Sequence, residues 1–124
     1  MSKETLPRHI LQAVEAVRAK KAGGVVLLDM REAASFTDYF LLCTSNSRPQ
    51  SQAIADEVEI KLKECGRMPA GVEGAGQGEW VLLDFLDFVV HIFQEKAREF
   101  YDLERLWRSA RRVELPAEKA VQRR

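Results

Sequence analysis

Four side chains of this chain have the chemistry to act as an acid, a base or a metal ligand: Asp38, Asp84, Asp87 and His91. Asp84 and Asp87 are three residues apart across a predicted turn, where carboxylates usually solvate the backbone. The sequence lacks a strand-borne Asp-x-Asp pair for magnesium, and no serine or cysteine is placed for activation by His91. Because these features are missing, an enzyme is only the alternative hypothesis. It would be a divergent metal-dependent nucleotidyltransferase that uses Asp38, Asp84 and His91.

The composition is that of one globular domain. Of the 124 residues, 46% are hydrophobic and 31% charged, and the formal net charge is zero, so a partner has to be recognised by a local patch. No apolar run approaches the roughly 20 residues of a membrane span. The two separated cysteines, Cys43 and Cys65, are typical of a reducing cytosol. We expect a cytoplasmic protein with no membrane segment, metal or cofactor.

Hydrophobic periodicity and turn residues divide the chain into helices and strands. The expected helices are Leu6–Lys21, a segment from Pro49 to Gly66, and the aromatic segment Arg98–Trp107. The expected strands are Val25–Leu28, Asp38–Thr44, a short stretch around Val72, and two arms of a hairpin within 79–93. This order predicts an α/β (α+β) domain with a mixed sheet of about five strands flanked by helices. We assign residues 1–112 to this single domain and 113–124 to a charged tail that frays.

The hairpin has Leu86-Asp87 as its expected two-residue turn. Pairing about this turn makes one face entirely apolar, and that face should lie on the helices. The opposite face is mixed in character, and its cross-strand pairs are Trp80 with Phe93, Leu82 with His91, and Asp84 with Val89. Aromatic anchors beside a few polar groups are typical of protein interfaces, so these six residues form the candidate docking surface. Two alternatives stay open: another element covers this face and makes Trp80 part of the core, or a different turn exchanges the faces.

Two features of the C-terminal third have simpler interpretations. Phe100, Leu103 and Trp107 have helical spacing, which predicts a stripe that packs on the sheet and leaves Tyr101 beside it. Arginines are frequent at this end, namely Arg105, Arg108, Arg111, Arg112, Arg123 and Arg124. Acidic residues interrupt them, which favours a salt-bridged, solvated helix over an RNA-binding surface. RNA binding, or a peripheral rRNA contact, is the third hypothesis.

Six short segments of the chain carry a family resemblance. They are Thr37–Phe40, Thr44–Ser47, Ile54–Val58, Gly78–Asp84, Asp87–Phe93 and Arg98–Trp107. In this order, and spread over residues 6–110, they resemble the Iojap family, the ribosomal silencing factors; the last segment is the most specific. The chain departs from the family pattern at Leu86, where members usually have glycine, and this departure bears on the geometry of the turn.

The resemblance implies a nucleotidyltransferase-like fold without its active site, and a role that is not enzymatic. It implies binding to ribosomal protein uL14 on the large (50S) ribosomal subunit, which obstructs joining of the small subunit and represses translation. It further implies that the strand Trp80–Asp84 binds the partner, so Trp80, Leu82 and Asp84 are carried over, whereas Val89, His91 and Phe93 rest on the hairpin pairing. An exposed apolar sheet face leaves a homodimer of the free protein open.

Overall fold

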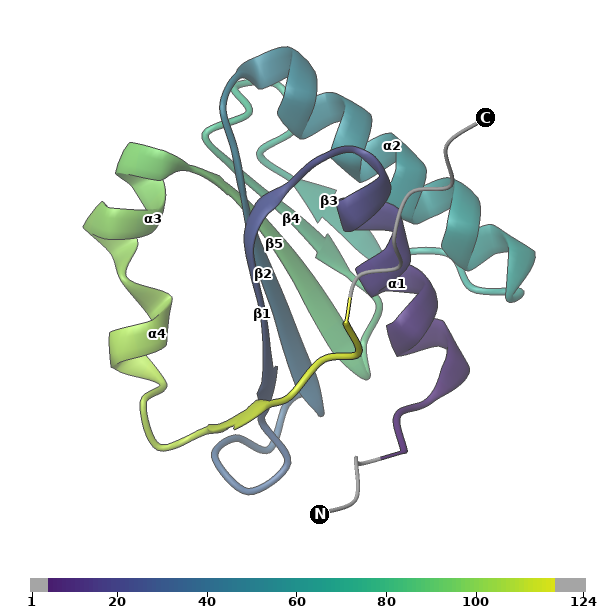
Figure 1. Cartoon of the computed structure of the whole chain (residues 1–124), viewed down its shortest axis with the longest axis vertical. Helices are drawn as coiled ribbons and strands as arrows, with labels where there is room; N and C mark the ends of the chain where they lie inside the picture. The colour runs from purple at the N-terminus through teal and green to yellow at the C-terminus, as the bar shows by residue number, and fades with distance from the viewer. Residues whose placement is uncertain (1–4, 118–124) are drawn as a thin grey trace.

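The structure, a computed structural model of the chain, describes residues 5–117. Its strands form one mixed sheet with helices on both faces (Figure 1). The strands are β1 (Gly23–Asp29), β2 (Tyr39–Ser45), β3 (Gly71–Glu73), β4 (Trp80–Asp84), β5 (Phe88–Gln94) and β6 (Arg111–Val113). The helices are α1 (Arg8–Ala19), α2 (Arg48–Glu64), α3 (Glu95–Tyr101) and α4 (Leu103–Leu106). The predicted α/β class is confirmed, although the sheet has six strands where about five were expected.

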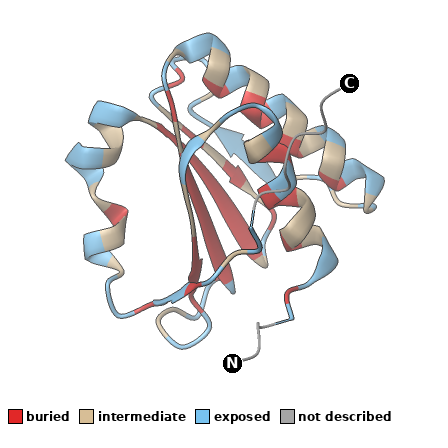
Figure 2. Ribbon diagram, in the orientation of Figure 1, coloured by how far each residue is buried: buried red, intermediate tan, exposed pale blue. Residues whose placement is uncertain are grey.

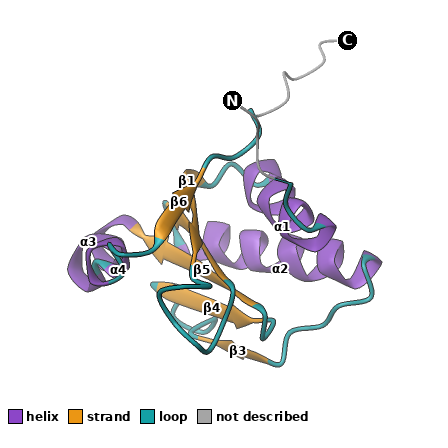
Figure 3. Ribbon diagram, turned by 90° about the horizontal axis from the view of Figure 1, so that it is seen from below, coloured by secondary structure: helices purple, strands orange, loops and turns teal. Residues whose placement is uncertain are grey.

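The strand order across the sheet is β3-β4-β5-β2-β1-β6. Only the central pair β2 and β5 is parallel, and every other neighbouring pair is antiparallel. Helices α1 and α2 cover one face, and α3 and α4 lie on the other (Figure 3). The middle of the sheet is buried between these layers (Figure 2), which divides the apolar interior into a larger core under α1 and α2 and a smaller core under α3 and α4.

The hairpin of β4 and β5 forms in the predicted register. Trp80 lies opposite Phe93, Leu82 opposite His91, and Asp84 opposite Val89, with Leu86-Asp87 at the turn. This confirms the pairing on which the two-face argument depends, and the alternative with exchanged faces is excluded.

The turn forces Leu86 into a strained backbone conformation. Its φ is +75°, and the Asp87 N–H donates to the Phe85 carbonyl oxygen at 3.0 Å, which is the hydrogen bond of a tight three-residue turn. The left-handed region costs a residue with a Cβ roughly 1–2 kcal/mol. The Leu86 side chain is 67% exposed, so it gains little from burial in return.

We expect Leu86→Gly to raise the free energy of unfolding by about 1 kcal/mol, because glycine adopts positive φ without steric strain and the gain exceeds its larger entropy in the unfolded chain. Urea unfolding followed by circular dichroism measures this change. Leu86→Ala is the matched control, since it removes the exposed side chain but keeps the Cβ. An equal gain from alanine would show that strain at this residue is not the cause.

The C-terminal third differs from its prediction in two ways. Asp102 adopts φ +47°, which ends α3 and starts α4 in a new direction. The spacing of Phe100, Leu103 and Trp107 therefore no longer describes one helical face: the stripe is wrong for Phe100, which is 79% exposed, whereas Leu103 is buried. The break escaped the sequence analysis because aspartate is tolerated in a helix and carries no strong stop signal.

The sixth strand lies where the tail was expected to begin. Strand β6 pairs antiparallel with β1, and Val113 is buried against the larger core. The predicted boundary between residues 112 and 113 thus falls inside a strand. Three residues are too few to show the alternation that marks a strand, and their partner lies far away in sequence. Residues 114–117 continue from β6 without helix or strand, and residues 118–124 of the predicted tail lie outside the described residues.

Candidate docking surface

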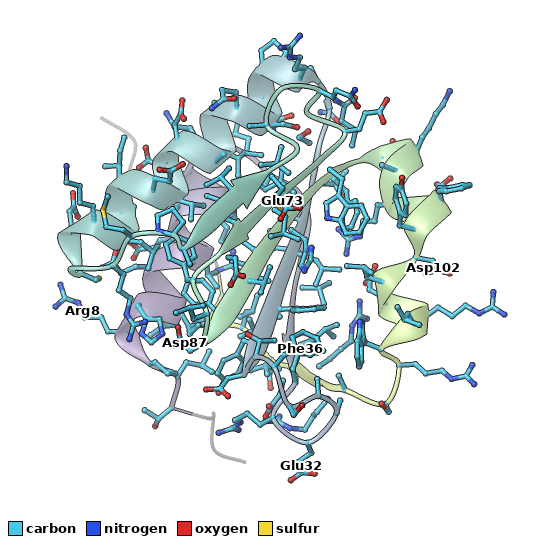
Figure 4. The ribbon with its side chains drawn as sticks, turned by 180° about the vertical axis from the view of Figure 1, so that it is seen from behind. Arg8, Glu32, Phe36, Glu73, Asp87 and Asp102 are labelled. Carbon is cyan, nitrogen blue, oxygen red and sulfur yellow. The ribbon has the colours of Figure 1, made fainter. Side chains whose placement is uncertain are left out.

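Strand β4 presents a half-exposed strip on the sheet face shared with α3 and α4. Successive side chains of a strand point to opposite faces, and β4 follows this rule: Trp80, Leu82 and Asp84 are half-buried, while Val81 and Leu83 are buried. Helix α3 contacts β5 and β2, and the pair α3–α4 lies to the side of β1 and β2 rather than over β3 and β4 (Figure 4). The strip on β4 is therefore accessible to a partner.

The three candidate residues of β5 lie deeper. Val89, His91 and Phe93 are 7%, 3% and 0% exposed. They share the face of the β4 strip, but β5 is a central strand with neighbours on both sides, and aromatic side chains cover it. Of the six residues predicted for this surface, those of β4 can meet a partner directly, and those of β5 lie beneath them.

Trp80 joins the accessible strip to this buried layer. Its ring centroid lies 4.9 Å from that of Phe93 and 4.5 Å from that of Tyr101 on α3. Its indole N–H donates to Nδ1 of His91 at 3.1 Å. The two alternatives for Trp80, core residue or surface anchor, thus each describe one side of the same half-buried ring.

His91 is a neutral, buried histidine. Because Nδ1 accepts from Trp80, the ring carries its proton on Nε2, and that atom has no hydrogen-bond partner among residues 5–117. Burial lowers the pKa of His91 to about 3, since an apolar environment disfavours the charged ring. The imidazole therefore keeps a free lone pair for Trp80 at physiological pH.

The sheet register adds a residue that the sequence analysis missed. Glu73 of β3 lies opposite Leu82, is exposed and stands on the open face of the sheet (Figure 4). Asp84 is the next residue along β4 on the same face as Leu82, and its Oδ1 accepts from the Leu86 N–H at 2.8 Å. Two carboxylates thus flank one aliphatic side chain. A strand near Val72 was predicted, but its pairing partner was not, so Glu73 had no assigned face.

We call this set of residues the β4 surface: Glu73, Trp80, Leu82, Asp84 and Tyr101. It combines two aromatic rings, one aliphatic side chain and two carboxylates on two adjacent strands and one helix. Such a surface suits a protein partner with an apolar contact area and nearby cationic groups.

The residues of the enzyme hypothesis do not form a site. Asp38 is exposed beside the hairpin turn, where its N–H donates to the Asp87 carbonyl at 2.9 Å, whereas His91 is buried. Within residues 5–117, no three His, Cys, Asp or Glu side chains are placed to hold a metal ion. Two open hollows, of ≈ 590 and ≈ 550 Å³, lie beside α3, and neither is lined by Asp38, Asp84 or His91.

The arginine-rich end is partly neutralised by acids. Arg111 donates to Asp29 at 2.9 Å, and Arg112 donates to Glu104 at 2.8 Å. Asp29 also accepts from Arg31 at 2.7 Å, and these arginines hold the pKa of its carboxyl well below its usual range. The ion pairs agree with a salt-bridged surface in this part of the chain. Arg123 and Arg124 lie outside the described residues.

Comparison with known proteins gives the family. The family described as "Ribosomal silencing factor during starvation" matches residues 3–124. The chain belongs to the ribosomal silencing factor family. The ribosomal silencing factor RsfS of Halalkalibacterium halodurans is 46% identical over 109 residues, which cover 87% of this chain and 93% of the relative. That of Bacillus subtilis is 41% identical over 98 residues, covering 79% and 83%.

Solved structures and organelle relatives extend the comparison. A crystal structure of a Chromobacterium violaceum protein superposes with a TM-score of 0.80 at 32% identity and covers 95% of both chains. The chloroplast protein Iojap of Arabidopsis thaliana is 35% identical over 99 residues, but this match covers only 41% of its length. Membership in the ribosomal silencing factor family makes the chain a ribosome-associated regulator of translation. Among the described helices, none is long and apolar enough to cross a membrane.

Proposed function

We propose that this protein binds ribosomal protein uL14 on the large ribosomal subunit through the β4 surface and thereby blocks joining of the small subunit. The observation that carries this proposal is the half-exposed Trp80–Leu82 pair, flanked by the carboxylates of Asp84 and Glu73. Ribosomal proteins are basic, so these acids complement the partner's charge, while the apolar pair supplies the anchors.

The mechanism is steric exclusion. A small domain that covers roughly 800 Å² of its partner reaches useful affinity when two or three anchors are well packed. The carboxylates contribute orientation and association rate more than affinity. No bond is made or broken, so we propose that the protein is not an enzyme and needs no cofactor. We further propose that it acts in the cytoplasm, that rRNA is at most a peripheral contact, and that the free protein can form a homodimer through its half-apolar face.

We expect Trp80→Ala to weaken binding to the large subunit by about 2 kcal/mol, roughly 30-fold, because a half-buried aromatic anchor is removed from the middle of the surface. Co-sedimentation with separated large and small subunits measures the loss. Light scattering then measures subunit joining, which the wild-type protein should reduce and the variant should not.

Matched variants separate lost binding from lost folding. Ile60→Ala removes an exposed apolar side chain from α2, on the far side of the sheet, and should bind as the wild type does. Leu82→Glu leaves Trp80 itself unchanged, places a charge in the middle of the β4 surface and should also abolish binding. If Trp80→Ala unfolds the domain and Leu82→Glu still binds, the β4 surface is not the docking site. Binding of the wild type to neither subunit would overturn the proposal itself.

A further inference from the structure

We propose that His91 is a positioning residue: it accepts a hydrogen bond from the indole N–H of Trp80 and so fixes the orientation of that ring. The partner then meets Trp80 as a purely apolar surface. The inference rests on the proposed function, because it concerns the same docking surface. It assigns to His91 a role that acts through Trp80 and involves no contact with the partner.

The two side chains meet diagonally across adjacent antiparallel strands. Trp80 lies opposite Phe93, and His91 lies opposite Leu82, yet the indole nitrogen reaches Nδ1 of His91 at 3.1 Å. The same indole packs between the rings of Phe93 and Tyr101, with centroids at 4.9 and 4.5 Å. Contacts from β5 and α3 thus restrain the ring, and the hydrogen bond sets its rotation within that space.

Packing alone does not account for a histidine at this position. His91 is 3% exposed, and its ring contacts the Phe40 ring edge-on with centroids 4.5 Å apart. A phenylalanine would fill such an apolar site without burying a polar atom. The histidine instead leaves Nε2 buried with no partner in the described part of the chain, which is unfavourable. What the histidine adds is an acceptor at Nδ1, and Trp80 uses it.

The hydrogen bond also determines what the partner meets. The indole N–H is the only polar group of a tryptophan side chain, and here it is already donated inside the protein. A partner therefore meets Trp80 as a fixed apolar plane, against which an aliphatic or aromatic group fits. Its cationic groups would find Asp84 and Glu73 further along the surface.

The first test uses the wild-type protein and needs no partner. The chain contains two tryptophans, so its two indole N–H resonances can be assigned by comparison with Trp80→Phe. We expect the Trp80 indole proton to exchange with water at least tenfold more slowly than a free indole, because it is hydrogen-bonded to a buried acceptor. Exchange at the rate of a free indole would overturn the inference.

The second test compares two replacements of His91. His91→Phe keeps a ring of similar size but removes the acceptor, whereas His91→Asn places Oδ1 near the position of Nδ1. We expect His91→Phe to lower affinity for the large subunit about tenfold and to change the emission of Trp80 in a Trp107→Phe background. His91→Asn should restore both to within about threefold.

The outcomes separate this inference from the proposed function. Wild-type affinity in His91→Phe, or equal losses in both variants, would show that His91 does not position Trp80 for binding. A wild-type protein that fails to bind the large subunit would remove the proposed function, while the exchange rate still decides whether His91 holds the indole. The exchange rate also decides the question if His91→Phe does not fold.

Discussion

Gly74→Ala is expected to lower the free energy of unfolding by roughly 3 kcal/mol or more, the largest effect expected from adding a Cβ at any of the chain's glycines. Gly74 has φ +79°, and a Cβ on it would lie 2.0 Å from the carbonyl oxygen of Trp80. The atom in the way belongs to the backbone of β4, which is paired along β5. It cannot move aside as a flexible side chain would, so either the β3–β4 connection or the β4–β5 ladder must be disrupted.

Two other glycines separate this clash from conformational strain. Gly66 also has positive φ, +76°, but no atom within 4 Å of an added Cβ, so Gly66→Ala should cost only about 1 kcal/mol. Gly76 has neither positive φ nor a close neighbour, and Gly76→Ala should be nearly neutral. Thermal and urea unfolding of the three variants measures the order of their stabilities. Similar stabilities for Gly74→Ala and Gly76→Ala would show that the loop before β4 adapts freely.

Acid is expected to destabilise the protein by about 2 kcal/mol between pH 6.5 and pH 4.5 through His91 alone. In the unfolded chain a histidine takes up a proton near pH 6.5, whereas burial keeps folded His91 neutral down to about pH 3. Between these values the unfolded state binds one more proton than the folded state. The free energy of unfolding therefore falls as the pH drops through 6.5, with a slope that approaches about 1.4 kcal/mol per pH unit at lower pH, and the His91 contribution is constant well above pH 6.5.

Variants separate the contribution of His91 from that of other titrating groups, because each changes how steeply the free energy of unfolding depends on pH. Urea unfolding at several pH values should show that His91→Asn loses this part of the slope, whatever its stability at pH 7. His9→Asn removes the chain's other histidine and should retain the His91 contribution. Asp29 and Glu104 have pKa values lowered mainly by hydrogen bonds from Arg31 and Arg98, and their stabilising contribution is lost at lower pH, as they take up protons. An unchanged slope in His91→Asn would contradict the buried, neutral state of this ring.

The hairpin is a feature that neighbouring residues in the sequence are sufficient to predict. Its register was predicted because alternation with period two and a two-residue turn are properties of neighbouring residues. The start of α2 is equally local: the Ser47 side chain accepts from the Gln50 N–H at 3.1 Å, and Pro49, where this helix was expected to begin, lies in its first turn. The family was also recognised from short segments in order, since each segment keeps its identity wherever it lies in the fold.

Accessibility within the candidate surface required the strand order. Leu82 and His91 lie opposite each other on one face, yet one is half-exposed and the other buried. The difference arises because β5 lies between β4 and β2, with rings packed over it, and β4 lies beside the short edge strand β3. Pairings such as β2 with β5 and β6 with β1 join segments far apart in sequence, so no local pattern specifies them.

The sequence by itself determined the fold class, the hairpin and the family, and it placed the three β4 residues on one face as a candidate docking surface, because all of these depend on patterns among near neighbours. Tertiary structure alone decided which of the six predicted residues reach solvent, that Glu73 joins them, and that His91 serves as an acceptor for Trp80. These properties depend on distances between side chains of different strands and helices. Such distances are set by how the layers pack around the sheet.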